Sequence, residues 1–312
     1  MKREILMFFM VALSILILGC AQQAEQPIGP FVGGDDGLEI GYVGGEPPSS
    51  IFDDNQEDFD ITVNVENVGE FDIPPNKVIG TLSGIDATSF SISNPNVVLK
   101  SGLEGVSKSS DDVFKGDEDE LRFENAKYKY DLVADFTTSV RMDICYLYQT
   151  RATTKVCLKK EATDRDTDDA CQVNNENIQV FNSGAPVQVN SVLERSSGTN
   201  KVQLSFTVEN KGSGTVYPPK QFSNTCVREQ DKEHRLDVEV RTGSGRHDVS
   251  CSQLDGKASG EIKLTENKKH IRCDISTSSA PAGAVEEPVN IVIGYFYKNA
   301  ITTPLDVEDS ES

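Results

Sequence analysis

One run of aspartates near the middle of the chain has the residue types and spacing of a cation site. It reads Asp-Arg-Asp-Thr-Asp-Asp and places Asp164, Asp166 and Asp168 at alternate positions. Carboxylate oxygens are the ligands that Ca²⁺ prefers, but this is not an EF-hand loop, because Asp169 and Asn175 stand where that loop needs Gly and Glu. The pattern predicts a loose calcium site. Its alternative is a solvated acidic linker kept extended by its own charge.

Three histidines are the other candidates for metal binding or catalysis. His234, His247 and His270 all lie in the second half of the chain beside charged residues, which is typical of solvated loops and strand ends. The sequence has no Gly-x-Ser-x-Gly, no His-Glu-x-x-His and no glycine-rich phosphate loop. We therefore expect a protein that is not an enzyme and has no cofactor beyond the calcium. The alternative is a surface hydrolase or solute-binding lipoprotein with its site in the second domain, near these histidines.

The amino terminus has the features of an export signal. Lys2 and Arg3 precede an apolar stretch from Ile5 to Leu18, which is shorter than the roughly 20 residues of a spanning helix. The following Ile-Leu-Gly-Cys resembles the lipobox of exported prokaryotic lipoproteins, bacterial and archaeal. That resemblance implies a signal peptide over residues 1–19 and a lipid on Cys20 that tethers the chain to a membrane. The alternative is an uncleaved anchor helix, and both place the rest of the chain outside the cytoplasm.

The other six cysteines predict three disulfides in an oxidising compartment, although 15 connectivities are open to six cysteines. The six are Cys145, Cys157, Cys171, Cys226, Cys251 and Cys273. Cys145 and Cys157 flank a predicted hairpin centred on Arg151, and residues placed symmetrically about a turn face each other. We therefore predict Cys145 with Cys157, then Cys251 with Cys273, which leaves Cys171 with Cys226.

Composition limits the partners of the chain. Lys and Arg number 30 against 50 Asp and Glu, for a net charge of −20. Such a chain is not expected to bind nucleic acid or an anionic lipid surface, because both would be repelled. Residues 20–36 are polar and rich in turn formers, and they predict a flexible tether behind the lipid.

The dominant pattern after the tether is a strand period of two. Apolar residues alternate with polar ones in three segments, and no segment of comparable length has a helical period. The sequence therefore predicts an all-β protein. The apolar positions are Phe59, Ile61, Val63 and Val65; Val202, Leu204, Phe206 and Val208; and Leu236, Val238 and Val240.

An internal repeat organises these strands. Residues 65–69, Val-Glu-Asn-Val-Gly, return as Val-Glu-Asn-Lys-Gly at 208–212, and Tyr146-Leu-Tyr148 returns as Tyr295-Phe-Tyr297. Two copies of one β domain are predicted, over residues 37–160 and 176–308, with an acidic linker over 161–175. We expect Asn-x-Gly to supply a positive φ for a tight turn, and Tyr-x-Tyr to place two aromatic rings on one face of a strand.

At these residues the chain resembles Ig-like domains of the CARDB type, in which an early strand runs into Val-x-Asn-x-Gly and a late strand pairs back over a short hairpin. The resemblance implies two tandem Ig-like β-sandwiches on a prokaryotic surface protein of the archaeal kind, with an adhesion or spacer role. It implies as partner an unidentified surface protein or glycan, and a location on the extracellular face of the cell membrane. It transfers no set of functional residues, and the chain has no Trp to match the buried tryptophan of antibody domains.

The lipid anchor can be tested by one substitution. Cys20→Ser removes the thiol that would carry the lipid, so we expect the protein to leave the membrane fraction or to accumulate with its signal peptide attached. Membrane fractionation and amino-terminal sequencing measure both outcomes. A Cys20→Ser protein that lacks residues 1–19 and still sediments with membranes would contradict the prediction.

Overall fold

The computed structural model describes residues 29–312 except 111, 164–169, 174–175 and 312. The predicted signal peptide, Cys20 and the aspartates Asp164, Asp166 and Asp168 lie outside these residues. The described chain is all-β, as predicted, with several antiparallel sheets and one short 3-10 turn, η2 (Ser252–Leu254), in place of any α-helix. None of its helical segments is long and apolar enough to cross a membrane.

The described strands fall into two sets, one from each copy. The first copy contains β1 (Leu38–Tyr42), β2 (Ser50–Phe52), β3 (Phe59–Asn67), β4 (Val78–Ser83), β5 (Asn96–Val98), β6 (Ser107–Ser109), β7 (Asp112–Phe114), β8 (Glu118–Ala126) and β9 (Phe136–Leu158). The second contains β10 (Val180–Asn182), β11 (Val187–Ser196), β12 (Lys201–Asn210), β13 (Thr215–Tyr217), β14 (Arg235–Thr242), β15 (Val249–Cys251), β16 (Ser259–Lys263), β17 (Lys268–Ser276) and β18 (Val285–Glu308).

The predicted alternation is confirmed in β3, β12 and β14. In each strand the apolar side chains named above are buried, while most of the polar side chains between them are at least partly exposed. β3 lies in a three-stranded sheet of order β1-β3-β8, and β12 lies in a four-stranded sheet of order β11-β12-β17-β15. The equivalent strands of the two copies therefore have equivalent neighbours.

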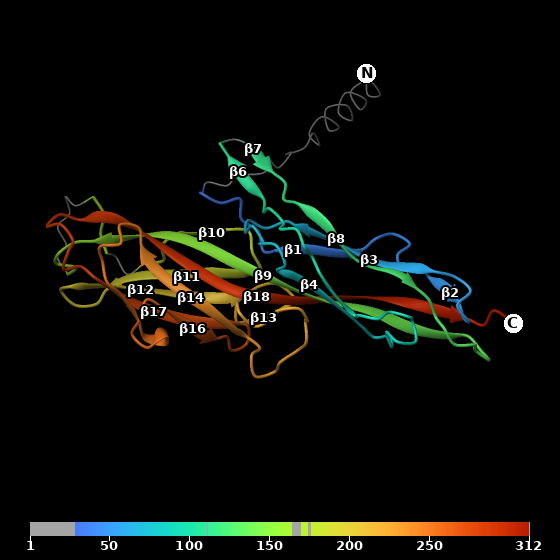
Figure 1. Cartoon of the computed structure of the whole chain (residues 1–312). Coiled ribbons are helices and arrows are strands. Elements are labelled where there is room, and N and C mark those ends of the chain that lie inside the picture. Colours follow the sequence, from blue (N-terminus) through green and yellow to red (C-terminus); the bar gives the residue numbers. More distant parts are fainter. Residues whose placement is uncertain (1–28, 111, 164–169, 174–175, 312) are drawn as a thin grey trace, which may run out of the picture.

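A nine-stranded sheet joins the copies. Its main path is β16-β14-β18-β9-β4-β5, so three strands of the second copy meet three of the first at the β18–β9 pair. These two strands have 24 and 23 residues, and they pair antiparallel from Phe136 opposite Val307 to Leu158 opposite Val285 (Figure 1). The far end of each strand thus reaches into the other copy: β18 also pairs with β2, and β9 with β10.

The hairpin predicted around Arg151 is wrong, because β9 passes through this position without a turn. The segment from 149 to 155 reads Gln-Thr-Arg-Ala-Thr-Thr-Lys and contains no Gly, Pro, Asn or Asp to reverse the chain, while its threonines favour a strand. β18 continues in the same way through Pro288 and Pro304.

The register of the β18–β9 pair has an internal symmetry. Tyr146 lies opposite Tyr297, and Tyr148 opposite Tyr295. Because Tyr146 and Tyr148 are the repeat equivalents of Tyr295 and Tyr297, exchanging the copies reproduces the same pairs, as a pseudo-twofold axis through Leu147 and Phe296 would. All four tyrosines are buried, and their neighbouring ring centroids lie 5.6–6.4 Å apart.

The repeated asparagine explains why this motif occurs twice. Asn67 accepts a hydrogen bond from the Tyr148 hydroxyl at 3.0 Å, and Asn210 accepts one from Tyr297 at 3.3 Å. Each asparagine also donates from Nδ2 to the carbonyl four residues later, at 2.8 Å in both copies. The turn after the early strand is therefore fastened to the central sheet by the late strand. We call this arrangement the Asn–Tyr latch.

The glycine of the motif is needed for a different reason from the one predicted. Neither Gly69 nor Gly212 has a positive φ, so the predicted left-handed turn is wrong. A Cβ on Gly69 would lie 2.1 Å from the Tyr148 hydroxyl oxygen, and one on Gly212 would lie 2.2 Å from that of Tyr297. Glycine is required because the latch tyrosine approaches the backbone too closely for a side chain.

The core lies mainly on one face of the nine-stranded sheet. Side chains from both copies form one continuous cluster between this inner face and the three- and four-stranded sheets. The outer face carries a smaller cluster of Ile79, Cys145, Tyr217, Phe222, Cys226 and Phe296. The copies share a sheet and a core, and the division of the chain into two domains at 37–160 and 176–308 stays a prediction.

Two of the three predicted disulfides are wrong. The structure pairs Cys145 with Cys226 and Cys157 with Cys171, and only Cys251 with Cys273 is as predicted. Cys145 and Cys157 lie on one unbroken strand, where twelve residues at about 3.3 Å each hold them far apart. The predicted bridge between Cys171 and Cys226 fails with it, since both of these residues have other partners.

The latch predicts that Gly69→Ala is destabilising. The added methyl group must displace the Tyr148 hydroxyl or the Gly184 carbonyl, which lies 2.5 Å from its position, and overpacking of this kind costs about 1–3 kcal/mol. Denaturant unfolding followed by circular dichroism measures the loss. Gly41→Ala is the matched control, because no atom lies within 4 Å of that Cβ; equal stability of the two variants would contradict the latch.

Candidate functional site

A long loop of the second copy lies across the outer face of the central sheet. Residues 218–234, which we call the crossing loop, connect β13 to β14. The loop leaves β13 beside Phe296 of β18 and reaches the first copy at Cys226, whose amide donates to the Thr81 hydroxyl of β4 at 2.9 Å. It returns so that His234 can donate its amide to Val216 of β13.

The Cys145–Cys226 disulfide fixes this loop in place. It joins the loop to β9 of the first copy, and Phe222 of the loop packs edge to face on Phe296 of β18 at 5.4 Å between ring centroids. Tyr217 packs against Phe222 in the same way at 4.9 Å. The loop therefore has an apolar base and a covalent attachment, and it divides the outer face into two concave regions.

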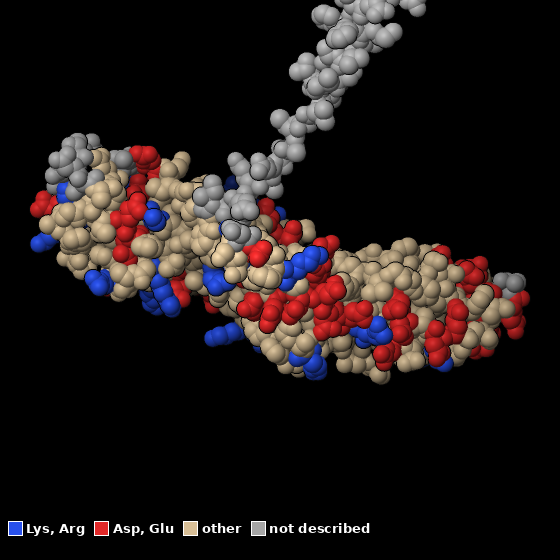
Figure 2. Space-filling model, turned by 90° about the horizontal axis from the view of Figure 1, so that it is seen from above, with Lys and Arg blue, Asp and Glu red and all other residues tan. Residues whose placement is uncertain are grey.

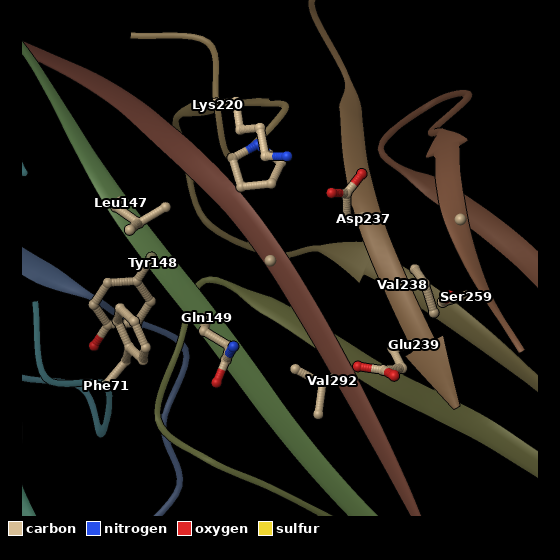
Figure 3. A pocket seen from close by; sticks show the side chains of 13 residues that line it. Phe71, Leu147, Tyr148, Gln149, Lys220, Asp237, Val238, Glu239, Ser259 and Val292 are labelled. Carbon is tan, nitrogen blue, oxygen red and sulfur yellow. The ribbon is translucent and has the colours of Figure 1, made fainter. Parts of the chain in front are cut away.

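The first region is a groove of about 560 Å³ beside Pro219 and Lys220 of the loop. Its floor consists of Leu147 of β9 with Val292 and Gly294 of β18, so both copies contribute (Figure 3). A Cβ on Gly294 would lie 4.0 Å from the Pro219 ring, which leaves little room above the floor at that point for any longer side chain.

The wall of the groove opposite β9 is acidic. Asp237 and Glu239 project from β14 toward the space that Lys220 borders from the loop (Figure 3). Glu239 is engaged by Arg241, whereas partial burial raises the pKa of Asp237 and the nearby Glu261 raises it further. An apolar floor between carboxylate, amide and ammonium groups can contact both the apolar and the polar parts of a ligand.

The second region, which we call the polar pocket, lies on the other side of the loop. It has a volume of about 430 Å³. Three cationic side chains and one carboxylate are among its lining residues, together with hydroxyl and amide groups: Arg141, Arg228, Lys298, Glu233, Ser213, Thr215, Tyr217, His234 and Asn299.

Two ion-pair groups hold the cations of the polar pocket. Glu233 accepts hydrogen bonds from Nε and Nη2 of Arg228 and from the Tyr217 hydroxyl, the last at 3.1 Å, and the Arg228 hydrogen bond holds the pKa of Glu233 below the usual range. Burial alone would raise the pKa of Asp143, but hydrogen bonds from Arg141 at 2.9 and 3.3 Å and the charge of Lys298 lower it. Both carboxylates are therefore held as anions.

The predicted histidines do not form one site. His234 lines the polar pocket, whereas His270 lines a separate cavity on β17 near Glu209 and Lys268. His247 lies in another loop, with Nδ1 3.1 Å from the Ser276 carbonyl oxygen. Within the described residues no three His, Cys, Asp or Glu side chains are placed to hold a metal ion. The calcium prediction on Asp164, Asp166 and Asp168 concerns undescribed residues.

The first copy contains a buried carboxylate with backbone partners and several exposed ones. Asp53 is buried and accepts from the amides of Leu132 at 2.6 Å and Ser310 at 3.1 Å, and hydrogen bonding at Ser310 keeps its pKa low. In the first copy Glu39, Glu66 and Glu118 lie side by side across β1, β3 and β8. Acidic side chains gather over this half in Figure 2, which matches the strongly negative net charge.

The crossing loop is not among the features predicted from the sequence, although the sequence contains a signal for it. Pro74-Pro75 stands three residues before β4, whereas the equivalent Pro218-Pro219 is followed by the whole loop before β14. The repeat spacing therefore changes at this point. An insertion that contains a cysteine absent from the other copy is the feature that marks the groove and the polar pocket.

No protein family and no curated protein matches the chain. Among solved structures, it is weakly similar to a serine-rich repeat adhesion glycoprotein of Streptococcus agalactiae, at 9% identity and a TM-score of 0.19, over 90% of this chain and 99% of that one. It is also weakly similar to the collagen-binding domain of an Erysipelothrix rhusiopathiae surface protein, at 8% identity and a TM-score of 0.14, over 87% and 93%. These values identify no family.

Glu194 is a further titratable group that the sequence did not single out. Its side chain is 4% exposed, and it accepts a hydrogen bond from the Cys157 amide at 2.5 Å. Burial raises its pKa to about 7, and this hydrogen bond only partly offsets the effect. A carboxyl whose pKa is raised on folding favours the folded state at low pH, and this contribution is lost as pH rises from about 4.5 through 7.

We therefore expect Glu194→Gln to raise the free energy of unfolding above that of the wild type at pH 8 and to change it little at pH 4. The amide oxygen can still accept from Cys157, while the cost of ionising a buried carboxyl, on the order of 3 kcal/mol, disappears. Denaturant unfolding of both proteins from pH 4 to 8 measures this difference. The exposed Glu229→Gln is the control, and a Glu194→Gln effect that does not grow with pH would show the prediction to be wrong.

Proposed function

We propose that this chain is an exported, lipid-anchored surface protein whose two tandem Ig-like β-sandwiches bind a surface protein or glycan partner without catalysis. The observation that carries the proposal is the groove, which both copies build on the outer face of their shared sheet. It is large enough for a polymer segment, has an apolar floor with polar walls, and is held open by a covalently attached loop.

Export is supported by the three disulfides, which are typical of proteins that fold outside the reducing cytoplasm. The lipid anchor rests on the resemblance of the amino terminus to a lipobox. A non-catalytic role is supported by the ion pairs of the polar pocket, where each carboxylate is already occupied by guanidinium or hydroxyl donors.

The attachment of the tether supports a binding role for the outer face. Glu70 accepts hydrogen bonds from the amides of Val32, Gly33 and Gly184 at 2.7–2.9 Å, which fixes the first described residues to the middle of the molecule. In Figure 1 this segment leaves above the central sheet, whereas the crossing loop lies below it. A chain tethered there would present the groove away from the membrane.

A pull-down from intact cells tests this function. The mature chain with Cys20→Ser is the bait, and Val292→Lys places a charged side chain on the apolar floor of the groove, so we expect capture of the partner to fall at least tenfold. Asn290→Lys is the matched control, because it changes an exposed residue on the same face of β18 outside the groove. Equal capture by all three baits, at equal melting temperatures, would contradict the proposal.

A further inference from the structure

The polar pocket differs in charge from the molecule around it. Arg141, Arg228 and Lys298 are opposed by the carboxylates of Asp143 and Glu233, which leaves a formal excess of one positive charge in a chain of net charge −20. An excess of positive charge in so acidic a protein selects for an anionic ligand and favours a monoanion over a dianion.

The two carboxylates hold the cations in position and leave donors free. Asp143 lies behind the lining residues, with 12% of its side chain exposed. It accepts hydrogen bonds from Arg141 and Ser83 and forms an ion pair with Lys298. Lys298 is itself 15% exposed and also donates to the Cys226 carbonyl at 2.9 Å. The two guanidinium groups are more exposed, at 47% for Arg141 and 62% for Arg228. Each bonds its carboxylate through Nε and one terminal nitrogen, so the edge formed by the two terminal nitrogens can still face a ligand.

The backbone at the edge of the pocket is constrained as well. His234 has a φ of +63°, a conformation that costs energy in most residues, and its amide and carbonyl are both hydrogen bonded, to Val216 and Leu264. Asn299 accepts a hydrogen bond from the Ala300 amide through Oδ1, so the donor nitrogen Nδ2 is the atom that can bind a ligand. The charged groups are therefore set among neutral donors on fixed backbone.

We propose that the polar pocket binds the carboxylate of an acidic sugar in a glycan. A guanidinium offers a carboxylate two parallel hydrogen bonds, and the neutral groups of Ser213, Thr215 and Asn299 suit the hydroxyls of a sugar ring. The volume of about 430 Å³ accommodates a monosaccharide unit with room for its neighbours. This inference goes beyond the proposed function, because the pocket and the groove lie on opposite sides of the crossing loop.

Calorimetric titration of the mature chain carrying Cys20→Ser with trigalacturonate tests the inference. We expect saturable binding to trigalacturonate and none to the neutral galactotriose. Arg141→Gln and Arg228→Gln should each weaken the affinity about tenfold, as expected for one charge-assisted contact. The affinity of Arg228→Lys should lie between those of the wild type and Arg228→Gln, because lysine keeps the positive charge but cannot make the two parallel hydrogen bonds of a guanidinium. Arg122→Gln, which removes a surface ion pair in the first copy, is the matched control.

Three results would contradict the assignment of an acidic sugar to the polar pocket. Binding that Arg228→Gln leaves unchanged, in a variant with the melting temperature of the wild type, would overturn it. Tighter binding of inorganic phosphate would overturn the choice of a monoanion, and selective binding of a peptide with a free rather than amidated carboxyl terminus would replace the sugar by a polypeptide. Val292→Lys should still bind trigalacturonate, because its substitution lies in the groove and not in the polar pocket. The two proposals can therefore fail independently of each other.

Discussion

The antiparallel pairing of β9 with β18 is the constraint on which the rest of the structure depends. It runs from Phe136 opposite Val307 to Leu158 opposite Val285, and it makes each copy the neighbour that completes the sheet of the other. An isolated copy would expose a strand edge of more than 20 residues, which is a template for aggregation. Fusing two copies in one chain covers both edges and yields a body with a single continuous core.

The Asn–Tyr latch determines the register of that pairing. A slip of one residue would turn Tyr146, Tyr148 and their partners from the core to the outer face and break the hydrogen bonds to Asn67 and Asn210. The four tyrosines pack around the pseudo-twofold axis, so each latch stabilises the other through ring contacts. The short motif that persists in both copies therefore specifies how the copies join, as well as the turn in which it occurs.

Much of the framework could be predicted from the sequence, because strand period and burial are local properties. The alternation at Phe59–Val65 and Val202–Val208 and the placement of both Tyr-x-Tyr rings on one face of a strand are confirmed. The errors concern long-range pairing. Nothing in a single sequence shows that residue 146 faces 297, and without that pair the threonine-rich stretch around Arg151 was predicted to be a hairpin. The disulfide errors followed from this one mistake, since Cys145 was paired within a turn that does not exist.

The two candidate sites lie where the repeat is broken. Inside the molecule the copies keep the same Asn, Gly and Tyr because the latch tolerates no change. On the outer face they differ: Cys145 of the first copy corresponds to Gly294 of the second. The cysteine anchors the crossing loop and the glycine leaves space beneath Pro219, so one pair of equivalent positions supplies both the attachment and the opening of the groove. Two similar copies acquire a single asymmetric outer face in this way, and they do so without disturbing the shared core.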